Sequence, residues 1–136
     1  FGDTLLFHVM EPSRAFQWYT QATWMIKKIQ QTPLSDAEIP SFDSQHTLKE
    51  LEFFREWCVG RLLGLQLSSN QQSCIDAFFH ELTKSLMEQP KTLIHRDFHS
   101  RNLMVLVTGD LACIDYQDAM LGPYLYDWVS LLRDCY

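Results

Sequence analysis

The sequence predicts an α+β fold that is mainly helical, and three observations support this prediction. Hydrophobic residues recur at helical intervals in three long segments that end before Pro90. Beyond Pro90 the pattern changes to short apolar runs separated by turn residues, which is typical of brief strands. A last amphipathic segment follows Gly122. We therefore expect three helices, a small cluster of strands and one closing helix within one domain of 136 residues.

The first helix is expected over residues 13–31, after the start signal Pro12-Ser13. Residues 32–45 contain two prolines among polar residues and are expected to form a loop. The second helix is expected over residues 46–66, and the third begins at a Ser68 or Ser69 cap and reaches about Glu88. The apolar stripes expected to face the core are Phe16, Tyr19, Ala22, Trp24, Met25, Ile26 and Ile29 in the first helix, Leu48, Leu51, Phe54, Cys58, Leu62 and Leu65 in the second, and Ile75, Phe78, Phe79, Leu82 and Leu86 in the third.

Short strands are expected at residues 92–95, 103–107 and 111–114. The stretch Thr108-Gly109-Asp110 supplies a hairpin turn between the last two strands, and the polar residues between the first two form another turn. Gly122-Pro123 is expected to open the closing helix. The apolar residues of that helix are Tyr126, Trp128, Val129, Leu131 and Leu132.

The composition excludes several classes of partner. A formal net charge of −6 provides no basic surface for nucleic acid or for an anionic membrane. No apolar run approaches the roughly 18 residues of a membrane span, and the first residues lack the basic region of a signal peptide. The four cysteines are widely spaced without a metal-ligand pattern, so we expect free thiols in a reducing compartment, the cytoplasm.

Residues 94–105, IHRDFHSRNLMV, concentrate acid, base and amide groups in a turn that has neither Gly nor Pro. Asp97 lies in this turn, Asn102 begins the next strand, and Asp115 ends the second strand of the hairpin. Because a hairpin folds back on itself, these three side chains should converge at one end of the sheet. Two carboxylates and an amide oxygen suit a proton acceptor and a hard divalent cation.

This set of groups is the one that phosphoryl transfer requires. Asp97 would accept or orient the proton of the attacking hydroxyl, while Asn102 and Asp115 would hold magnesium against the phosphates of ATP. The run His95-Arg96-Asp97-x-x-x-x-Asn102 matches the kinase catalytic-loop pattern H-R-D-x-x-x-x-N, and Asp115 stands where the Asp of D-F-G would stand. The sequence therefore predicts a kinase that uses ATP and Mg²⁺.

The segment LIHRDFHSRNLMVL…GDLACIDYQDAMLGPYLYDWVSLLRD resembles the aminoglycoside phosphotransferase and choline-kinase family, kinase-like enzymes that act on small molecules. That family shows H-x-D-x-x-x-x-N, then I-D-[FWY]-x-[DE], then a helix similar to G-x-x-x-x-D-L-A. The stretches IDYQDAMLGP and DWVSLLRDCY look most like the bacterial kinases of the family that phosphorylate the anomeric hydroxyl of N-acetylmuramate and N-acetylglucosamine during cell-wall recycling. The resemblance is dense over residues 90–136 and looser over residues 1–89. It implies the carboxy-terminal lobe of a protein-kinase-like fold, with a small β-hairpin carrying the catalytic loop.

The resemblance also implies roles for the residues around the loop. The ring of His95 would brace the catalytic loop, and Asp127 would hydrogen-bond its backbone. Asp118 is either a second carboxylate near the metal or a cap of the following segment. Arg96 departs from the Gly that is usual in this family, and the sequence gives no account of its contacts.

The acceptor sugar would bind between the catalytic loop and the helices, as the resemblance implies. The candidate sugar contacts are Glu52, Trp57, His99 and Tyr124. Core packing is the preferred interpretation of Trp57, because it lies near an apolar stripe, and the same interpretation is given to Trp18 and Trp24.

Protein kinases are the nearest rival family, because Arg96 completes a true H-R-D. Two features argue against them: Asp115 is followed by Tyr-Gln-Asp, and too few residues separate it from Pro123 for an activation loop. An aminoglycoside, choline or another small alcohol stays open as the acceptor. A kinase-like binding module that has lost its chemistry is the alternative from a different class of function.

The chain begins Phe1-Gly2-Asp3 without an initiator Met, and these residues look like those just after the hinge of the family. We therefore expect residues 1–136 to be the catalytic and substrate-binding carboxy-terminal lobe of a longer enzyme, without its amino-terminal nucleotide lobe. This lobe should fold alone, because its apolar stripes are expected to face one another. It should be inactive alone, because a phosphate-gripping loop and its Lys are missing.

Overall fold

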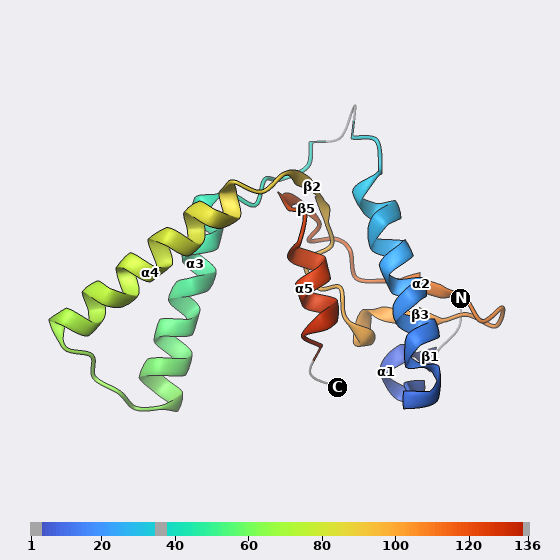
Figure 1. Ribbon diagram of the computed structural model, residues 1–136, viewed down its shortest axis with the longest axis horizontal. Coiled ribbons are helices and arrows are strands. Elements are labelled where there is room, and N and C mark those ends of the chain that lie inside the picture. Colours follow the sequence, from blue (N-terminus) through green and yellow to red (C-terminus); the bar gives the residue numbers. More distant parts are fainter. Residues whose placement is uncertain (1–3, 35–37, 135–136) are drawn as a thin grey trace. The chain divides into compact units, whose positions relative to one another are not determined.

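The computed structural model describes residues 4–34 and 38–134 (Figure 1). The hinge-like Phe1-Gly2-Asp3 lies outside the described residues. The chain divides into two compact units, which are Phe1–Ser41 with Lys91–Tyr136, and Phe42–Pro90. Each unit is described by itself, and the assignment of residues 1–136 to one lobe stays a prediction.

The first unit begins with β1 (Thr4–Leu5) and the single turn α1 (Leu6–Val9), neither of which the sequence analysis had assigned. The long helix α2 (Pro12–Gln30) follows and confirms the first predicted helix. Pro12 occupies the first turn, where a missing N–H costs nothing. The basic residues Lys27 and Lys28 lie in the last turn, where they complement the helix dipole.

One face of α2 is buried. Trp18, Ala22 and Ile26 recur at intervals of four residues and are fully buried. Trp24 and Phe16 fall outside this series, and their side chains are 58% and 87% exposed. The predicted burial of Trp18 is confirmed, whereas core positions for Trp24 and Phe16 were wrong, because a straight helix turns only one stripe toward the core.

The three-stranded sheet has the order β1-β3-β4 and is antiparallel throughout. Strands β3 (Leu103–Val105) and β4 (Leu111–Cys113) form the predicted hairpin, although both are shorter than expected. Their register places Leu103 opposite Cys113. At the turn, Gly109 adopts a φ of 83°, a conformation that glycine reaches without steric cost.

A separate two-stranded sheet pairs β2 (Lys91–Ile94) with β5 (Met120–Pro123). The expectation that Gly122-Pro123 opens the closing helix was therefore wrong. Both residues are buried in β5, and Pro123 is the last residue of its strand, where the ladder tolerates a missing N–H. The closing helix α5 (Tyr126–Leu132) begins only after a further turn.

The core of the first unit joins α2 to the sheet, the catalytic loop and α5. Phe98 of the loop and Leu131 of α5 are both buried in it. Its buried members are Leu6, Trp18, Ala22, Ile26, Phe98, Leu103, Leu111 and Leu131. The loop is therefore attached to the best-packed part of this unit.

The second unit consists of α3 (Ser44–Phe53), η1 (Phe54–Leu62) and α4 (Ser69–Met87), with α3 packed against α4. Ser68 caps α4 through a reciprocal capping box, which confirms one of the two predicted caps. The carboxylate of Asp43 caps α3 and accepts backbone N–H bonds, which lower the pKa of that carboxyl group. No helix within residues 4–34 and 38–134 is both long and apolar enough to cross a membrane.

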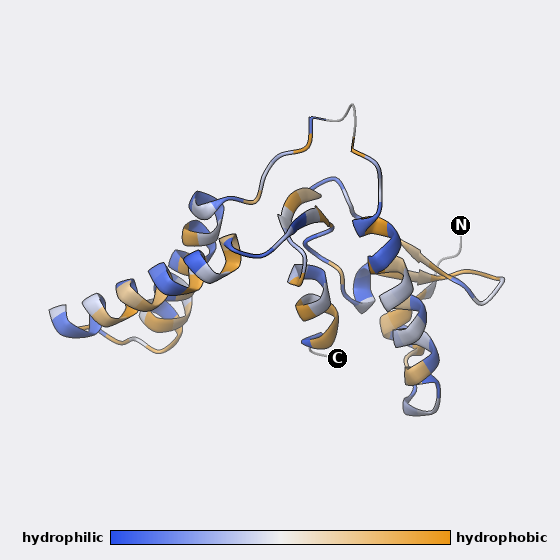
Figure 2. Cartoon of the chain, turned by 45° about the horizontal axis from the view of Figure 1, so that its top comes forward, coloured by the Kyte–Doolittle hydropathy of each residue, from blue (hydrophilic) through white to orange (hydrophobic). Residues whose placement is uncertain are grey.

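Residues 54–62 form a π-helix, and this explains why the stripe predicted for the second helix is wrong at Phe54 and Leu62. Hydrogen bonds in a π-helix run from residue i to i+5, so the 3.6-residue period no longer holds. Phe54 and Leu62 are 51% and 79% exposed. Trp57 is 53% exposed, so its interpretation as a core residue was wrong. The Cζ atom of Arg61 lies 4.0 Å from the centre of the Trp57 ring. Hydrophobic and hydrophilic residues alternate along the helices of this unit (Figure 2).

Candidate active site

The predicted catalytic loop, residues 95–102, connects β2 of one sheet to β3 of the other. It ends in η2 (Ser100–Asn102), a single 3₁₀ turn. The loop backbone bonds to itself, because the N–H of His99 donates to the carbonyl of Asp97 at 3.1 Å. The N–H of Asn102 donates in turn to the carbonyl of His99 at 2.9 Å. These bonds fix a compact turn without glycine or proline.

Asp127, in the first turn of α5, holds the start of the loop. Its two carboxylate oxygens accept the backbone N–H groups of His95 at 2.7 Å and of Arg96 at 3.0 Å. The side chain is fully buried, and burial raises the pKa of this carboxyl group although both N–H bonds favour the anion. These are the backbone contacts that the family resemblance implied for Asp127.

The ring of His95 braces the loop against the hairpin. His95 is almost completely buried, and its Nε2 lies 3.0 Å from the carbonyl oxygen of Ile114. Because a carbonyl can only accept, Nε2 carries the proton in this bond. The ring also meets Phe98 edge to face, at 5.8 Å between ring centres. Through His95, the loop is therefore tied to the end of β4.

Asn102 fixes Asp97 from the other side of the loop. Its Nδ2 donates to the carbonyl of Asp97 at 2.9 Å, which orients the side-chain oxygen Oδ1 away from that bond. The carboxylate of Asp97 itself is exposed. Two donors, from His99 and Asn102, thus hold the backbone of Asp97 while its side chain stays open to a reactant.

The hairpin brings Asp115 to the same end of the sheet. The N–H of Ile114 donates to the carbonyl of Asn102 at 3.0 Å, which continues the β3–β4 ladder beyond its last strand pair. Asp115 is the next residue, and its Oδ1 accepts a bond from Gln117 at 3.0 Å. Hydrogen bonds therefore link Asp97 to Asn102 and Asn102 to Ile114, the residue before Asp115, and the chemical roles of the three polar residues stay predictions.

The donor set fits a hard cation that also binds phosphate. Asn102 Oδ1 and the second carboxylate oxygen of Asp115 are oxygen donors, which Mg²⁺ prefers. Mg²⁺ is usually held by one or two carboxylates together with substrate phosphates rather than by an all-protein cage. Among the described residues, no cluster of three or more His, Cys, Asp or Glu side chains is placed to hold a metal ion, so the residues considered for Mg²⁺ are one amide and one carboxylate.

The remaining predicted residues are distributed over both units. Asp118 is exposed in the turn between β4 and β5, and Tyr124, 38% exposed, follows β5. His99 lies in the catalytic loop, and its buried Nδ1 has no hydrogen-bond partner within the described part of the chain. Glu52 and Trp57 belong to the second unit, where Glu52 pairs with Arg55 at 3.2 Å.

The sequence analysis missed two groups that support the loop. One is the carbonyl of Ile114, which a sequence pattern cannot reveal. The other is Asp134, whose carboxylate accepts the N–H of Ser100. No sequence signal pointed to Asp134, because it lies beyond the end of the closing helix and its bond to Ser100 joins residues far apart in the chain.

Two non-glycine residues of this site have left-handed backbones: Arg96 with a φ of 78° and Asp115 with a φ of 69°. Residues with a Cβ rarely adopt this region, although Asp tolerates it better than most. At Arg96 the family usually has Gly, which adopts a positive φ freely. The positive φ accounts for the Gly that is usual at this position, and Arg96 keeps that backbone while its N–H bonds to Asp127.

This conformation predicts the outcome of two substitutions at one position. Arg96→Gly removes the steric cost of a positive φ, whereas Arg96→Val places a β-branched residue there. We expect the free energy of unfolding of Arg96→Val to be about 1–3 kcal/mol lower than that of Arg96→Gly. Urea denaturation of both variants measures the difference, and equal stabilities would show that position 96 does not need a left-handed backbone.

Comparison with known proteins shows which family this chain belongs to. The sequence profile described as "Phosphotransferase enzyme family" matches residues 4–136. The chain belongs to the phosphotransferase enzyme family. A phosphotransferase-family protein of Pseudomonas putida, named N-acetylmuramate/N-acetylglucosamine kinase, is 35% identical over 135 residues, which are 99% of this chain and 39% of that protein. A protein of the same name from Neisseria meningitidis serogroup B is 42% identical over 98 residues, 72% of this chain and 29% of its own length.

A solved structure shows the same fold. The crystal structure of an aminoglycoside-3'-phosphotransferase of type VIII superposes with a TM-score of 0.63, covering 91% of this chain and 46% of that one, at 10% identity. This likeness concerns the fold alone, and it confirms the predicted kinase-like α+β class. The chain of this phosphotransferase-family member spans 39% of the length of the Pseudomonas relative.

Proposed function

We propose that the protein containing this chain is a small-molecule kinase that transfers the γ-phosphoryl group of ATP to an aminosugar. The acceptor is the anomeric hydroxyl of N-acetylmuramate or N-acetylglucosamine, in cell-wall recycling in the cytoplasm. The hydrogen bonds that join Asp97 to Asn102, and Asn102 to the residue before Asp115, carry this proposal. Support for the acceptor comes from the curated relatives, which are named as kinases of these two sugars.

Asp97 is the proposed general base. Its exposed carboxylate can take the proton of the sugar hydroxyl while the oxygen of that hydroxyl bonds to the γ-phosphorus and ADP leaves. Geometry matters more than basicity for such a group, because a misplaced base loses most of its effect. The hydrogen bonds from His99 and Asn102 to the Asp97 carbonyl support this role, since they fix the backbone that carries the base.

Asn102 and Asp115 are the proposed ligands of magnesium. When bound, Mg²⁺ neutralises charge on the phosphates of ATP. Asp118 does not cap the closing helix, because α5 has no side-chain cap. We therefore propose it as a further carboxylate near the magnesium ligands, since it shares an exposed loop with Asp115. His95 and Asp127 are proposed to support the loop and not to act on a reactant, because both side chains are buried and bond to backbone groups.

The proposed sugar contacts combine aromatic faces with polar groups, the composition that suits a carbohydrate ring. His99 adjoins the general base in the loop, and Tyr124 is exposed after β5. In the second unit, Trp57 exposes an aromatic ring and Glu52 an acceptor for sugar hydroxyls. We propose His99 and Tyr124 as contacts of the acceptor, and the same role for Glu52 and Trp57 of the second unit stays a prediction from the sequence.

The test is a substrate screen with the complete protein that contains these residues. Magnesium-ATP is offered with N-acetylmuramate, N-acetylglucosamine, kanamycin and choline, and ADP formation is followed. We expect turnover with the two N-acetylated sugars, and ³¹P NMR should show phosphate on the anomeric oxygen. Preference for kanamycin or choline would overturn the proposed acceptor. The absence of turnover with every compound would favour a binding module.

A further inference from the structure

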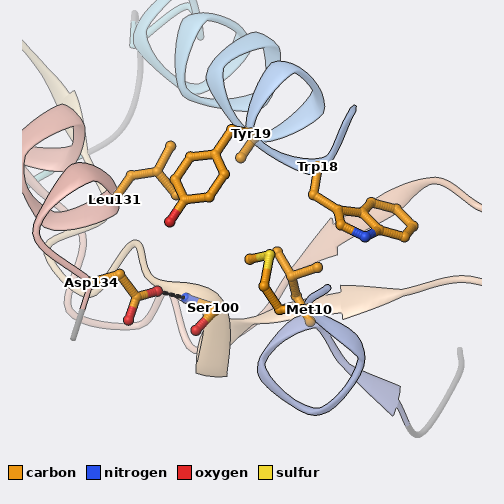
Figure 3. A pocket seen from close by; sticks show the side chains of 8 residues that line it. Met10, Trp18, Tyr19, Ser100, Leu131 and Asp134 are labelled. Atoms are coloured by element: carbon orange, nitrogen blue, oxygen red, sulfur yellow. Dashed lines mark hydrogen bonds between the residues drawn. The ribbon is translucent and has the colours of Figure 1, made fainter. Parts of the chain in front are cut away.

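The far end of the catalytic loop is held by a carboxylate that the sequence analysis did not assign. Asp134 lies just beyond α5, and its Oδ2 accepts the backbone N–H of Ser100 (Figure 3). Ser100 is 2% exposed and opens the 3₁₀ turn η2, of which Asn102 is the last residue. A carboxylate–amide bond at this place therefore fixes the turn that carries a proposed magnesium ligand.

Asp134 and Asp127 act on the loop from the two ends of one helix. Asp127 accepts the N–H groups of His95 and Arg96, and Asp134 accepts that of Ser100. Asp127 lies in the first turn of α5 and Asp134 just beyond its last residue, so the two acids flank the helix. The catalytic loop is thus held at both ends, with Asp97 between the two points.

The position of Asp134 is unfavourable for the helix itself. A negative charge at the carboxy-terminal end of a helix opposes the helix dipole, where a basic residue would be favoured. The charge also acts on Tyr19 of α2, because burial and the nearby Asp134 carboxylate together raise the pKa of that hydroxyl. Stabilisation of α5 therefore does not account for an acid here, whereas the bond to the loop does.

The bond between Ser100 and Asp134 lies in apolar surroundings. Leu131, Met10 and Trp18 line the crevice together with Tyr19, Ser100 and Asp134 (Figure 3). Within the described residues, Asp134 Oδ1 and Ser100 Oγ are buried without a hydrogen-bond partner. A charge-assisted bond shielded from water is stronger than an exposed one, and its loss leaves a buried N–H unpaired.

We propose that Asp134 is a positioning residue for the metal site, acting on Asn102 through the Ser100 backbone. This inference rests on the proposed phosphotransferase function, because it concerns the cation that this function requires. Removing the carboxylate releases the first residue of η2, so the side chain of Asn102 no longer holds one orientation. Residues that orient metal ligands typically affect metal affinity about 10–100-fold when they are lost.

The experiment compares Asp134→Ala with Asp134→Asn in the complete protein. For the Ala variant we expect the magnesium concentration at half-maximal rate to rise about tenfold or more, with little change in the KM for the sugar. The Kd of Mn²⁺, measured by electron paramagnetic resonance with a non-hydrolysable ATP analogue, should rise to the same extent. The Asn variant keeps an oxygen acceptor for Ser100 and should stay within about threefold of the unmodified protein.

Asp110→Ala is the matched control, since it removes an exposed carboxylate from the hairpin turn of the same unit. It should leave both metal measurements unchanged. If Asp134→Ala lowers only the thermal stability and leaves the Mn²⁺ Kd unchanged, Asp134 is merely structural and the inference is wrong. If the unmodified protein binds Mn²⁺ but transfers no phosphate, the proposed function fails while the Kd comparison still tests the positioning role.

Discussion

Asp97→Asn should lower the turnover number of the complete protein roughly 10²–10⁴-fold. The substitution keeps the size of the side chain and removes its capacity to accept a proton. Because the Asp97 carbonyl, not its carboxylate, accepts the bonds from His99 and Asn102, the loop should keep its conformation. Steady-state kinetics with N-acetylglucosamine and magnesium-ATP measure the loss.

Nucleotide affinity separates a chemical role of Asp97 from a binding role. The Kd of ATP, measured by calorimetry, should change little, because the proposed metal ligands are other residues. Asp110→Asn, in the exposed hairpin turn, is the control and should keep normal turnover. Normal turnover of Asp97→Asn would make this residue a mere turn former, and the proposed mechanism would have to be abandoned.

The proposed catalytic loop can be recognised in the sequence because the chemistry predicted for it depends on residue type and spacing. A general base and two metal ligands must come from specific side chains, so Asp97, Asn102 and Asp115 are visible in the sequence. The hairpin turn at Thr108-Gly109-Asp110 was equally visible, and it fixes which residues of the two strands meet. Local rules thus sufficed for this hairpin, whose contacts are close in sequence.

The backbone conformations and the second sheet could not be predicted in this way. No pattern of residue types reveals that Arg96 has a positive φ, because Arg at such a position is rare. Gly122-Pro123 resembles a helix start, yet these residues pair with β2. That pairing joins segments far apart in the chain, and local propensity carries no information about it.

Burial in the second unit was mispredicted for a related reason. The stripe through Phe54, Cys58 and Leu62 assumes a regular α-helix, but residues 54–62 form a π-helix. The wider turn moves Trp57 to the surface, where it makes a cation–π contact with Arg61. The helix was therefore predictable as an element, whereas the face that it buries was not.

Asp127→Ala should lower the free energy of unfolding by about 2–6 kcal/mol. The variant leaves the N–H groups of His95 and Arg96 without their acceptor in the protein interior, and each such group costs about 1–3 kcal/mol. A loss of this size is a large fraction of the stability of a typical domain. Urea denaturation of the complete protein measures it, with Asp110→Ala as the control that should stay near the unmodified value.

The stability of Asp127→Asn can be measured instead if the Ala variant does not fold. The amide keeps one acceptor oxygen but presents its Nδ2 to the other N–H donor, so an intermediate loss of stability is expected. Comparison with the unmodified protein across pH then isolates the titration of Asp127, because the amide does not ionise. The other titrating groups are common to both proteins and cancel in the difference.

The direction of this pH dependence follows from the raised pKa of Asp127. Since the folded state binds the proton more tightly than the unfolded state, the stabilising contribution is complete below the ordinary pKa of about 3.9. It is lost as the pH rises through the higher pKa of the folded state. The stability advantage of the unmodified protein over the Asp127→Asn variant should therefore shrink as the pH rises from about 4. An advantage that grows over this range would mean that the N–H bonds from His95 and Arg96 outweigh burial and hold the pKa of this carboxyl group down.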